Sequence, residues 1–415
     1  MQEGKQSTRI VVVGSGGREH AICDVLVREG YHVIATPGNV GISKSAECTD
    51  QDPRQLTADL FVIGPEAPLV EGLADDLRAQ SKLVFGPGRS GALLEGSKDF
   101  MKEVAAAANV PTARYATFTD VDEAISYLSN KVGPYIIKTD GLAAGKGVLV
   151  TSDLESAIED VRAKLSGASF GQAGTKVIIE DFLSGREVSV LAILDGERAV
   201  LLPAAADHKR LNDGDLGPNT GGMGAFAPVE WFDESLQQQT MDRIITPVIQ
   251  ELKGRGIDYR GVLYAGLMVN DGGPSLVEFN VRFGDPEAQV VIPLLEGGFG
   301  SVLFAAAGGD LSQVDLKPNG AGAVVVMSAS GYPNSPRRGD KIVGLAAIED
   351  NSAVRVYHSG TSVDQDGDLV TSGGRVLGIT ALGKSKEEAL ERAYAAVSRV
   401  AFDGAHYRRD IGVGR

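Results

Sequence analysis

The sequence predicts a protein of three domains: an N-terminal parallel α/β domain, a mainly antiparallel α+β domain and a small C-terminal β-rich domain. A length of 415 residues is enough for about three domains of ordinary size. Strand and helix patterns alternate in the first part of the chain, which is typical of a parallel sheet. The glycine- and proline-containing segment 308–320 is typical of a linker, and strand patterns follow it. We therefore expect domains at 1–95, 96–310 and 320–415.

Composition excludes several classes of protein. The net charge of −15 argues against general binding to nucleic acids or anionic membranes, because those surfaces attract basic proteins. The two cysteines, Cys23 and Cys48, form neither a disulfide framework nor a C-x-x-C metal pattern. No apolar run approaches the ~18 residues that span a bilayer, and the polar start of the chain lacks the apolar core of a signal peptide. We expect a soluble cytoplasmic protein that contacts neither nucleic acid nor membrane.

The first domain is expected to be a sheet of parallel strands. The apolar, β-branched run at 9–14 predicts a buried strand. Similar runs predict further strands at 31–36, 60–64 and 83–86. Ligands of such sheets bind beyond the carboxyl ends of the strands. In this chain those ends carry the motifs G-S-G-G-R-E-H, P-G-N-V-G and G-P-E-A-P-L.

The motif G-S-G-G-R-E-H at 14–20 lies at a strand-to-helix turn. Backbone N–H groups and the helix dipole make such a turn an anion site. A dinucleotide fingerprint requires a glycine where Glu19 stands, and the second strand ends without the acidic residue that binds a ribose. Arg18 suits a phosphate monoester. We interpret the turn as a phosphate site, with a NAD site and a purely structural turn as the alternatives.

The second domain is expected to begin with a helix over 98–108, capped by Ser97. The next helix, at 153–165, is expected to begin with the capping box formed by Ser152 and Glu155. A later helix is predicted at 240–253. Strands of this domain are predicted at 135–138, 148–150, 176–180, 188–194, 262–269 and 275–281.

The segment G-L-A-A-G-K-G at 141–147 joins two predicted strands. Lys146 within it and Lys138 before it could neutralise the phosphates of one nucleotide. The glycines do not have the P-loop spacing. A mobile flap over phosphates is therefore one interpretation, and a flexible hairpin with a solvated lysine is the other.

The run Asp207-His208-Lys209-Arg210 is the most basic local cluster of the chain, and a glycine-rich loop follows it at 217–224. Three consecutive donors before a pliable loop predict a site for a transferring phosphoryl group or an acyl phosphate. The alternative is an ordinary exposed, charged turn.

The strand at 275–281 carries the most informative pattern. Glu278, Asn280 and Arg282 alternate, so they share one face, about 6–7 Å from neighbour to neighbour. Carboxylate and amide oxygens suit Mg²⁺, and an arginine fork neutralises phosphate or carboxylate oxygens. The pattern favours a site that uses Mg-ATP, in which catalysis is electrostatic and needs no covalent nucleophile. A solvated edge strand is the alternative.

The third domain is expected to have strands near 321–328, 353–357 and 375–382. An amphipathic helix is predicted at 386–400.

These motifs together closely resemble the phosphoribosylamine–glycine ligase family, also called glycinamide ribonucleotide synthetases. The resemblance rests on G-S-G-G-R-E-H, G-P-E-A-P-L, K-T-D-G-L-A-A-G-K-G, D-H-K-R with G-P-N-T-G-G-M-G, E-F-N-V-R-F-G-D-P-E, G-G-R-V-L-G and Y-R-R-D-I-G. The resemblance runs in order from about residue 9 to residue 412. The segment between Gly41 and Leu60 is shorter than the resemblance implies.

The resemblance implies an α/β with α+β architecture in which 96–310 is an ATP-grasp domain with a mobile subdomain at about 112–187. It implies a ligase of purine biosynthesis. ATP would phosphorylate glycine to glycyl phosphate, and the amine of 5-phosphoribosylamine would attack it, giving glycinamide ribonucleotide, ADP and phosphate. The domain 1–95 would bind 5-phosphoribosylamine. The expected partners are ATP, glycine and 5-phosphoribosylamine, and the expected assembly is a monomer or a weak dimer.

The resemblance also implies roles for individual residues. ATP would be bound by Lys98, Lys138, Lys146, Glu180, Asp181, Phe182, Leu183 and Glu187. The metal, Mg²⁺ with Mn²⁺ as a substitute, would be bound by Glu278 and Asn280. The catalytic residues would be Arg282, Lys146 and Asp215. The substrates would be bound by Gly16, Gly17, Arg18, Asn39, Glu66, Asp215, Arg282, Asp285 and Arg375.

Two alternative functions remain at this point. One is another ATP-grasp ligase acting on a purine-pathway ribonucleotide, such as a carboxylating or formylating enzyme. The D-H-K-R run followed by P-N-T-G-G-M-G favours the glycine ligase instead. The other is a nucleotide-binding regulatory protein without turnover, against which the joint presence of Lys146, Glu278, Asn280 and Arg282 argues.

Overall fold

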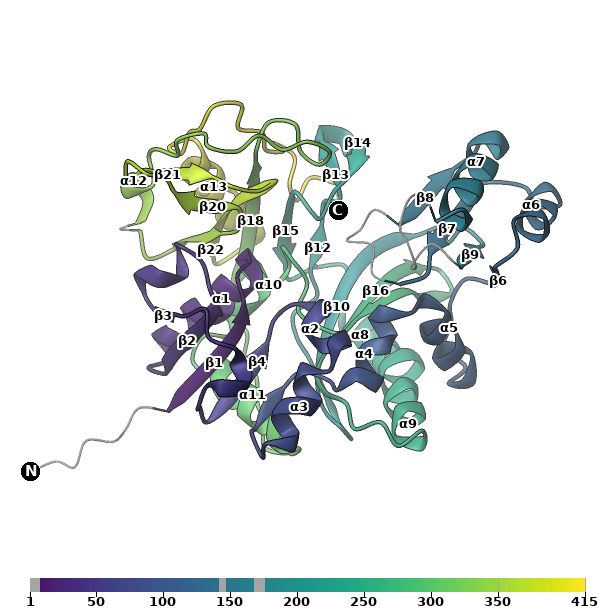
Figure 1. Cartoon of the computed structure of the whole chain (residues 1–415), viewed down its shortest axis with the longest axis horizontal. Helices are drawn as coiled ribbons and strands as arrows, with labels where there is room; N and C mark the ends of the chain where they lie inside the picture. The colour runs from purple at the N-terminus through teal and green to yellow at the C-terminus, as the bar shows by residue number, and fades with distance from the viewer. Residues whose placement is uncertain (1–7, 142–146, 168–175, 350, 415) are drawn as a thin grey trace, which may run out of the picture.

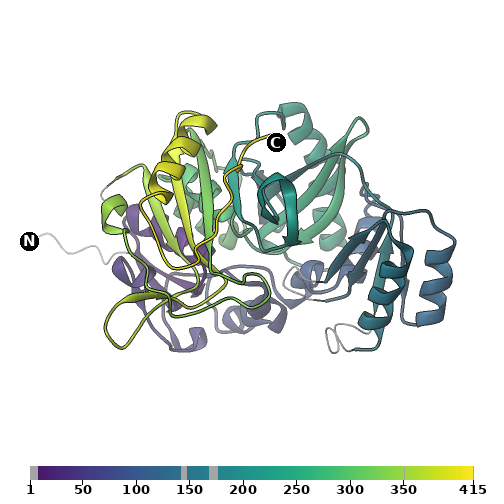
Figure 2. The ribbon, with the colours of Figure 1, turned by 90° about the horizontal axis from the view of Figure 1, so that it is seen from above.

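The molecule has two sides, which are joined by long strands at its centre (Figure 1). The computed structural model describes residues 8–141, 147–167, 176–349 and 351–414. The N-terminal and C-terminal parts of the chain lie together on one side, and a small sheet with two helices projects from the other (Figure 1 and Figure 2). Strands β10 and β16 of a larger antiparallel sheet lie between the two sides (Figure 1).

The N-terminal part is a parallel sheet in the order β3-β2-β1-β4-β5. Its strands are β1 (Arg9–Gly14), β2 (His32–Pro37), β3 (Glu47–Cys48), β4 (Leu60–Ile63) and β5 (Val84–Phe85). Almost every side chain of β1 and β4 is buried, because helices cover both faces of the sheet. The four predicted strands are confirmed; β3, with only two residues, leaves no periodic signal.

The helices of this part begin at the carboxyl ends of the strands or follow them closely. They are α1 (Gly17–Arg28), α2 (Glu66–Glu71), α3 (Leu73–Ala79), α4 (Arg89–Gly96) and the single-turn helices η1 (Ile42–Lys44) and η2 (Pro53–Gln55). The short segment between Gly41 and Leu60 therefore contains η1, β3 and η2 and no longer helix. Cys23 of α1 is completely buried.

The projecting sheet is antiparallel, in the order β6-β9-β7-β8. Its strands are β6 (Tyr115–Phe118), β7 (Tyr135–Thr139), β8 (Val148–Thr151) and β9 (Val177–Glu180), and its helices are α6 (Val121–Ser129) and α7 (Leu154–Leu165). These elements have a hydrophobic core of their own, which includes Leu128, Ile137 and Val161. Helix α5 (Lys98–Ala107) precedes them, and Ser97 caps it as predicted, because its side chain accepts a hydrogen bond from the amide of Phe100 at 3.2 Å.

The larger antiparallel sheet has the order β11-β10-β16-β17. Its strands are β10 (Arg186–Asp195), β11 (Ala199–Leu201), β16 (Arg260–Asn270) and β17 (Gly273–Asn280). Helix α8 (Glu234–Thr240), the π-helical turn η5 (Met241–Ile245), helix α9 (Thr246–Gly254) and helix α11 (Phe299–Gly308) accompany it. The register of β16 and β17 shifts beside Gly266, which pairs with Glu278, whereas the next residue pairs with Leu276.

Two predicted helix starts were wrong, because another side chain provides the cap. Asp153, not Ser152, caps α7, and its carboxylate accepts from the amide of Ser156 at 2.8 Å. The helical region predicted from residue 240 begins earlier, because Asp233 caps α8 by accepting from the amide of Leu236 at 3.0 Å. Both caps are Asp residues placed just before an acidic first turn.

The C-terminal sheet contains strands from two distant parts of the chain. Its order is β12-β15-β18-β22-β19. Strands β18 (Ala321–Ser328), β19 (Val354–His358) and β22 (Arg375–Gly383) were predicted, and helix α13 (Lys386–Val397) packs on β18 and β22. Strands β12 (Ala206–Asp207) and β15 (Gly224–Ala227) come from the region before the linker and complete the sheet. The remaining short elements are β13 (Arg210–Asn212), η4 (Asp213–Asp215), β14 (Leu216–Asn219), α10 (Ala288–Val291), η6 (Ile292–Leu295), α12 (Ala346–Glu349), β20 (Thr361–Val363) and β21 (Leu369–Thr371).

In the described part of the chain, no single helix is both long enough and apolar enough to cross a membrane. One bent pair, Ala288–Leu295 with Phe299–Gly308 at 98°, meets that test by length and composition only.

Candidate active site

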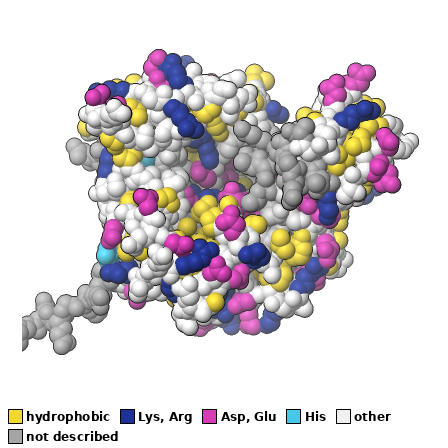
Figure 3. Space-filling model, viewed as in Figure 1, with side chains coloured by type: hydrophobic (Ala, Val, Ile, Leu, Met, Phe, Trp, Pro, Cys, Tyr) yellow, Lys and Arg dark blue, Asp and Glu magenta, His cyan; other side chains and the backbone are white. Residues whose placement is uncertain are grey.

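A cavity of about 550 Å³ lies where the N-terminal part, the two antiparallel sheets and the C-terminal part meet. Acidic and basic side chains gather in the hollow near the centre of the face in Figure 3. The predicted site residues that line this cavity are Arg18, Glu66, Lys98, Lys138, Glu180, Asp181, Phe182, Leu183, Glu187, Glu278, Asn280, Arg282, Asp285 and Arg375. The structure therefore brings together residues that are up to several hundred positions apart in the sequence.

Glu278 lies among the lysine side chains of this cavity. Burial disfavours its charged form, but the ammonium groups of Lys209, Lys138 and Lys98 outweigh burial and hold the pKa of the Glu278 carboxyl below its ordinary value. Glu278 is therefore ionised at neutral pH. Asn280, two residues further along β17, lines the same cavity. The i, i+2 spacing of a strand thus places both groups on one wall, as predicted.

These two residues fit a magnesium ion that is shared with phosphates. A search of the described residues finds no group of three or more His, Cys, Asp or Glu side chains arranged to hold a metal. Mg²⁺ commonly keeps waters and takes only one or two protein carboxylates together with substrate phosphates. One carboxylate and one amide oxygen beside several lysines match that mode of binding.

Lys138 and Glu180 form a buried ion pair beside β17, where the Lys138 ammonium also donates to the carbonyl of Val277 at 3.2 Å. The Lys138 ammonium lies 2.9 Å from Glu180 Oε2, and Lys102 lies 3.2 Å from Glu180 Oε1. Lys102 is completely buried and also donates to the hydroxyl of Thr112 at 2.9 Å. Sequence reasoning missed Lys102, although its position between the buried residues Met101 and Val104 was an available signal.

Lys98 is positioned by the segment after β7. Its backbone amide donates to Asp140 Oδ1 at 2.7 Å, and its ammonium donates to the carbonyl of Gly141 at 3.1 Å. Burial lowers the pKa of Lys98, although Glu278 opposes that effect. Lys146 lies outside the described residues.

Glu180 ends β9, and Asp181 to Leu183 follow it in the part of the cavity that is expected to bind ATP. Asp181 is anchored by Arg114, whose Nε lies 2.7 Å from Asp181 Oδ2, and by Lys131. Phe182 is 52% exposed although it is large and apolar. An exposed aromatic face at the edge of a polar cavity is suited to stacking against a planar ring.

Glu187 and Lys209 form an ion pair across the cavity wall between β10 and the segment after β12. Burial works against the charge of Lys209, but Glu187 and Asp207 outweigh it and raise the pKa of Lys209 well above its ordinary value. Lys209 is therefore a permanent cation near Glu278.

The predicted convergence of His208, Lys209 and Arg210 was wrong. Lys209 lines the cavity, but His208 is buried and its Nε2 accepts from the amide of Gly412 at 2.9 Å. Arg210 donates to the carbonyl of Gly217 at 2.8 Å. Consecutive side chains of an extended segment point in different directions, so three neighbours in sequence do not reach one ligand.

Arg282 links two walls of the cavity. We call the side formed by Glu278 and Asn280 the strand wall, and the side formed by Arg18 and Glu66 the N-terminal wall. Its Nη2 lies 2.8 Å from Glu95 Oε1 and 3.3 Å from Asn280 Oδ1, and its Nε lies 3.3 Å from Glu66 Oε2. Burial opposes the charge of Arg282, but Glu95 and Glu66 outweigh it and raise its pKa. Arg18 on α1 completes the contact, since its Nη1 lies 3.9 Å from the same oxygen of Glu66.

Glu95 was not predicted from the sequence. Its Oε2 accepts from the amide of Val281 at 2.8 Å while Oε1 holds Arg282, so one carboxylate fixes both the end of β17 and the guanidinium beyond it. Burial raises the pKa of Glu95, and Arg282 only partly offsets this. A second unpredicted group is Glu287, which accepts from Ser189 at 3.1 Å and from Tyr264 at 3.0 Å and also lines the cavity.

Glu19 occupies the turn at which a dinucleotide would bind. Its carboxylate accepts from the amide of Gly16 at 2.6 Å and from Arg18 Nε at 2.5 Å. A side chain at Gly14 or at Gly64 would collide with the side chain of Glu19. The glycines here therefore make room for this carboxylate, which argues against the NAD interpretation.

Four predicted substrate residues lie around the cavity without lining it. Gly16 and Gly17 begin α1 and face Asp285 and Gln289 respectively. Asn39 accepts from the amides of Gly41 and Ile42 and donates to the carbonyls of Ser15 and His358, at 2.8–2.9 Å. Asp215 is exposed on the β13–β14 hairpin, and its carboxylate lies 2.7 Å from Arg408 in the C-terminal tail.

Arg375 joins the C-terminal sheet to the cavity. Its Nη1 donates to the carbonyls of Gly221 at 2.7 Å and Asp285 at 2.8 Å. The same nitrogen lies 3.3 Å from the Asp285 carboxylate. Three separate parts of the chain therefore meet at one guanidinium.

Family models match almost the whole chain. They describe the N domain of phosphoribosylglycinamide synthetase at residues 8–95, its ATP-grasp (A) domain at 96–288 and its C domain at 322–414. The chain belongs to the phosphoribosylglycinamide synthetase family. The resemblance predicted from the sequence motifs is thereby confirmed.

Similar curated members of the phosphoribosylglycinamide synthetase family match almost the full chain. The chloroplastic phosphoribosylamine–glycine ligase of Arabidopsis thaliana is 47% identical over 414 residues, which are 95% of this chain and 78% of that protein. The phosphoribosylamine–glycine ligase of Caldanaerobacter subterraneus is 41% identical over 419 residues, which are 98% of this chain and 100% of that protein.

Solved structures share the architecture. The crystal structure of phosphoribosylamine–glycine ligase from Thermotoga maritima has a TM-score of 0.88 and 36% identity, covering 98% of this chain and 100% of the other. The biotin carboxylase domain of the Hydrogenobacter thermophilus 2-oxoglutarate carboxylase has a TM-score of 0.72 at 15% identity, covering 97% of this chain and 92% of the other, which shows a common fold. The predicted fold class, with a parallel N-terminal domain, an ATP-grasp domain and a C-terminal domain, is confirmed.

Proposed function

We propose that this protein joins glycine to 5-phosphoribosylamine with ATP, giving glycinamide ribonucleotide, ADP and phosphate, a step of purine biosynthesis. The observation that supports this most strongly is the match to all three domains of phosphoribosylglycinamide synthetase, at 8–95, 96–288 and 322–414. The cavity between those domains has the charges that the chemistry requires.

The first step transfers a phosphoryl group. A carboxylate oxygen of glycine attacks the γ-phosphorus of ATP, ADP leaves, and glycyl phosphate forms. Such a transfer concentrates negative charge on the phosphoryl oxygens and needs positioned cations. We assign this task to Lys98, Lys138 and Arg282, which line the cavity around Glu278. Glu278 and Asn280 would hold Mg²⁺, which supplies further neutralisation of the phosphates; use of Mn²⁺ stays a prediction.

The second step forms the carbon–nitrogen bond. The amine of 5-phosphoribosylamine attacks the carbonyl carbon of glycyl phosphate, phosphate leaves, and the nitrogen loses a proton. We assign the binding of this amine substrate to the wall formed by Arg18 and Glu66, because both lie beside Arg282 at the carboxyl end of the parallel sheet. Asp285 and Arg375 border the same end of the cavity.

ATP is assigned to the other end of the cavity. Glu180 to Leu183 would contact the base, and Glu187 would contact the ribose. The support is that these residues line the cavity with Phe182 exposed beside them. The roles of Lys146 and Asp215 stay predictions, because Lys146 lies outside the described residues and Asp215 pairs with Arg408 away from the cavity lining.

The test is an assay of ADP release in which each substrate is omitted in turn. ADP should form only when ATP, Mg²⁺, glycine and 5-phosphoribosylamine are all present, and mass spectrometry should find glycinamide ribonucleotide in equal amount. Glu103→Gln is a matched control, since this exposed carboxylate of α5 pairs with Arg255 outside the cavity. Equal ADP release when bicarbonate or formate replaces glycine would contradict the proposal in favour of a carboxylating or formylating ligase.

A further inference from the structure

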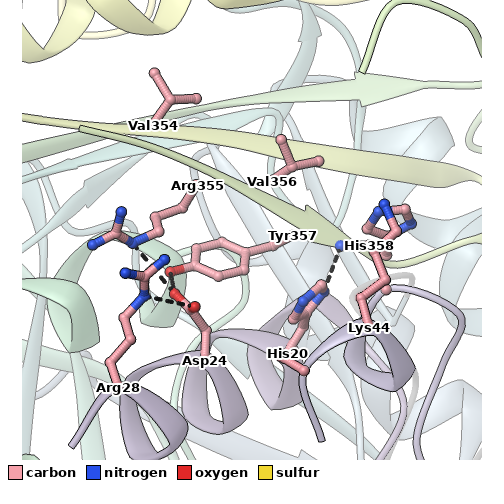
Figure 4. A pocket seen from close by; sticks show the side chains of 11 residues that line it. His20, Asp24, Arg28, Lys44, Val354, Arg355, Val356, Tyr357 and His358 are labelled. Atoms are coloured by element: carbon pink, nitrogen blue, oxygen red, sulfur yellow. Dashed lines mark hydrogen bonds and ion pairs between the residues drawn. The ribbon is translucent and has the colours of Figure 1, made fainter. Parts of the chain in front are cut away.

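A second cavity, of about 280 Å³, lies between the N-terminal and C-terminal parts of the molecule. Helix α1, the segment around η1 and strand β19 form its walls (Figure 4). Its lining residues are His20, Asp24, Arg28, Gly41, Lys44, Ser45, Val354, Arg355, Val356, Tyr357 and His358. Among the described residues, none lines both this cavity and the candidate active site. We call it the α1–β19 cavity.

Positive charge exceeds negative charge in the α1–β19 cavity. Of the described residues that line it, Arg28, Lys44 and Arg355 are cationic and Asp24 is anionic. The Asp24 carboxylate is already occupied, because Oδ1 accepts from Arg28 Nε at 2.8 Å and Oδ2 accepts from the hydroxyl of Tyr357 at 3.1 Å. A cluster of cations is unusual for a protein whose net charge is −15.

Arg355 is the buried member of this cluster. Its side chain is only 8% exposed, and its Nε lies 3.4 Å from Asp24 Oδ2 without making a hydrogen bond to any described residue. Its Nη2 lies 3.3 Å from Glu296, which does not line the cavity. Figure 4 shows the guanidinium groups of Arg355 and Arg28 side by side, next to Asp24. Because an arginine guanidinium stays charged in proteins, Arg355 contributes a fixed positive charge to the wall of the cavity.

Two histidines form the other end of the α1–β19 cavity. His20 Nδ1 accepts from the backbone amide of His358 at 2.9 Å, so the proton of its neutral ring is on Nε2. Burial, His358 and Lys44 lower the pKa of His20 to about 3. The ring is therefore neutral at physiological pH.

We propose that the α1–β19 cavity binds a small phosphate-bearing anion, either inorganic phosphate or a phosphate monoester. Two arginine forks and a lysine are the side chains that match phosphate oxygens. The volume lies just below the range of roughly 300–1,000 Å³ that is usual for drug-sized ligands, which favours nothing larger than a sugar phosphate. A bound anion would connect α1 to β19 and so hold the N-terminal and C-terminal parts together.

The test compares phosphate binding to the full chain and to two variants. Inorganic phosphate should raise the melting temperature of the wild type, and calorimetry should give a dissociation constant. Lys44→Ala should weaken that binding by about tenfold or more, as loss of one charge-assisted hydrogen bond does. Lys44 is exposed, so this change should not prevent folding. Lys317→Ala, an exposed linker lysine, is the matched control and should bind phosphate as the wild type does.

Arg18→Ala distinguishes the two cavities, because Arg18 lines only the active-site cavity. Phosphate should stabilise Arg18→Ala as much as the wild type, and at the same concentration it should stabilise Lys44→Ala less. The reverse pattern, or the absence of any phosphate binding to the wild type, would overturn the proposal. Ribose 5-phosphate is the second probe: binding tighter than that of phosphate indicates a monoester ligand, and equal binding indicates recognition of the phosphate group alone. No turnover is measured, so failure of the ligase assay would leave this result unaffected.

Discussion

The two walls of the active-site cavity are built differently. On the strand wall, Glu278 and Asn280 come from one strand, so local alternation places them together. On the N-terminal wall, Arg18 is held by the carbonyl of Phe283, at 3.2 Å and 265 positions away in sequence. The strand wall depends on local geometry and the N-terminal wall on contacts between domains. We infer that the strand wall carries the charge changes of the reaction and that the N-terminal wall positions the amine substrate.

The largest effect is expected from Glu278→Gln on the strand wall. Loss of the carboxylate removes a negative charge that faces Lys98, Lys138 and Lys209, and it removes one of the two side chains proposed to hold Mg²⁺. We expect kcat to fall by about two to three orders of magnitude, as when a stabilising group is removed from a reacting centre. Steady-state ADP release measures the loss, and a circular dichroism melt verifies the fold. A kcat close to that of Glu103→Gln would show that the strand wall does not take part in the reaction.

An intermediate effect is expected from Glu95→Gln, at the junction of the two walls. The amide can still accept from Val281 but no longer offers a charge to Arg282. A charged hydrogen bond contributes about 1.5–3 kcal/mol, which corresponds to roughly a tenfold to hundredfold loss in kcat/KM.

Glu95→Asp sharpens this prediction. It keeps the charge but shortens the side chain, so it should recover part of the lost activity. A purely structural role for Glu95 would instead lower the melting temperature of both variants equally, without that recovery in kcat/KM.

A smaller effect is expected from Arg18→Ala on the N-terminal wall. Removing this buried cation should raise the KM for 5-phosphoribosylamine by about tenfold or more, in line with ~1.5–3 kcal/mol for a charged hydrogen bond. The KM for ATP should change little. Arg54→Ala is the control, because Arg54 is a partly exposed arginine of the same domain that pairs with Asp76. Equal increases in both KM values would contradict the proposal that the two walls have different roles.

The smallest effect on turnover is expected at His20, a residue of α1 that accepts a hydrogen bond from the amide of His358 at the end of β19. Its pKa is about 3 in the folded protein and 6.5 ordinarily. The unfolded chain therefore binds more protons between these values, and the free energy of unfolding should fall as the pH drops below 6.5. This residue contributes at most about 1.4 kcal/mol per pH unit.

Urea unfolding at pH 7 and pH 5 measures this dependence. His20→Asn should reduce the difference between the two pH values, because asparagine can still accept from His358 but does not titrate. The control His32→Asn changes a partly exposed histidine and should leave the difference unchanged. Identical pH dependence in wild type and His20→Asn would show that α1 is not held through a neutral imidazole.

The sequence alone was sufficient where a few neighbouring residues decide the structure. The strand pattern around Glu278 and Asn280 and the cap at Ser97 follow from local periodicity and hydrogen bonding, and both were predicted. Family motifs extended this to the fold class, and most of the site residues that they predicted line the cavity. The caps at Asp153 and Asp233 show the limit, since several polar residues compete locally and only the folded backbone decides between them.

Tertiary structure alone decided which distant side chains meet. Glu95 holds Arg282 across 187 positions, and Lys102 reaches Glu180 inside the protein, although neither contact leaves a local pattern. Strands β12 and β15 also leave no local pattern that predicts their partner: they precede the linker in sequence but pair within the C-terminal sheet, where β15 lies beside β18. Periodicity reports which face of an element is buried, but the partner of that face is chosen by packing and charge complementarity between segments that the chain brings together only on folding.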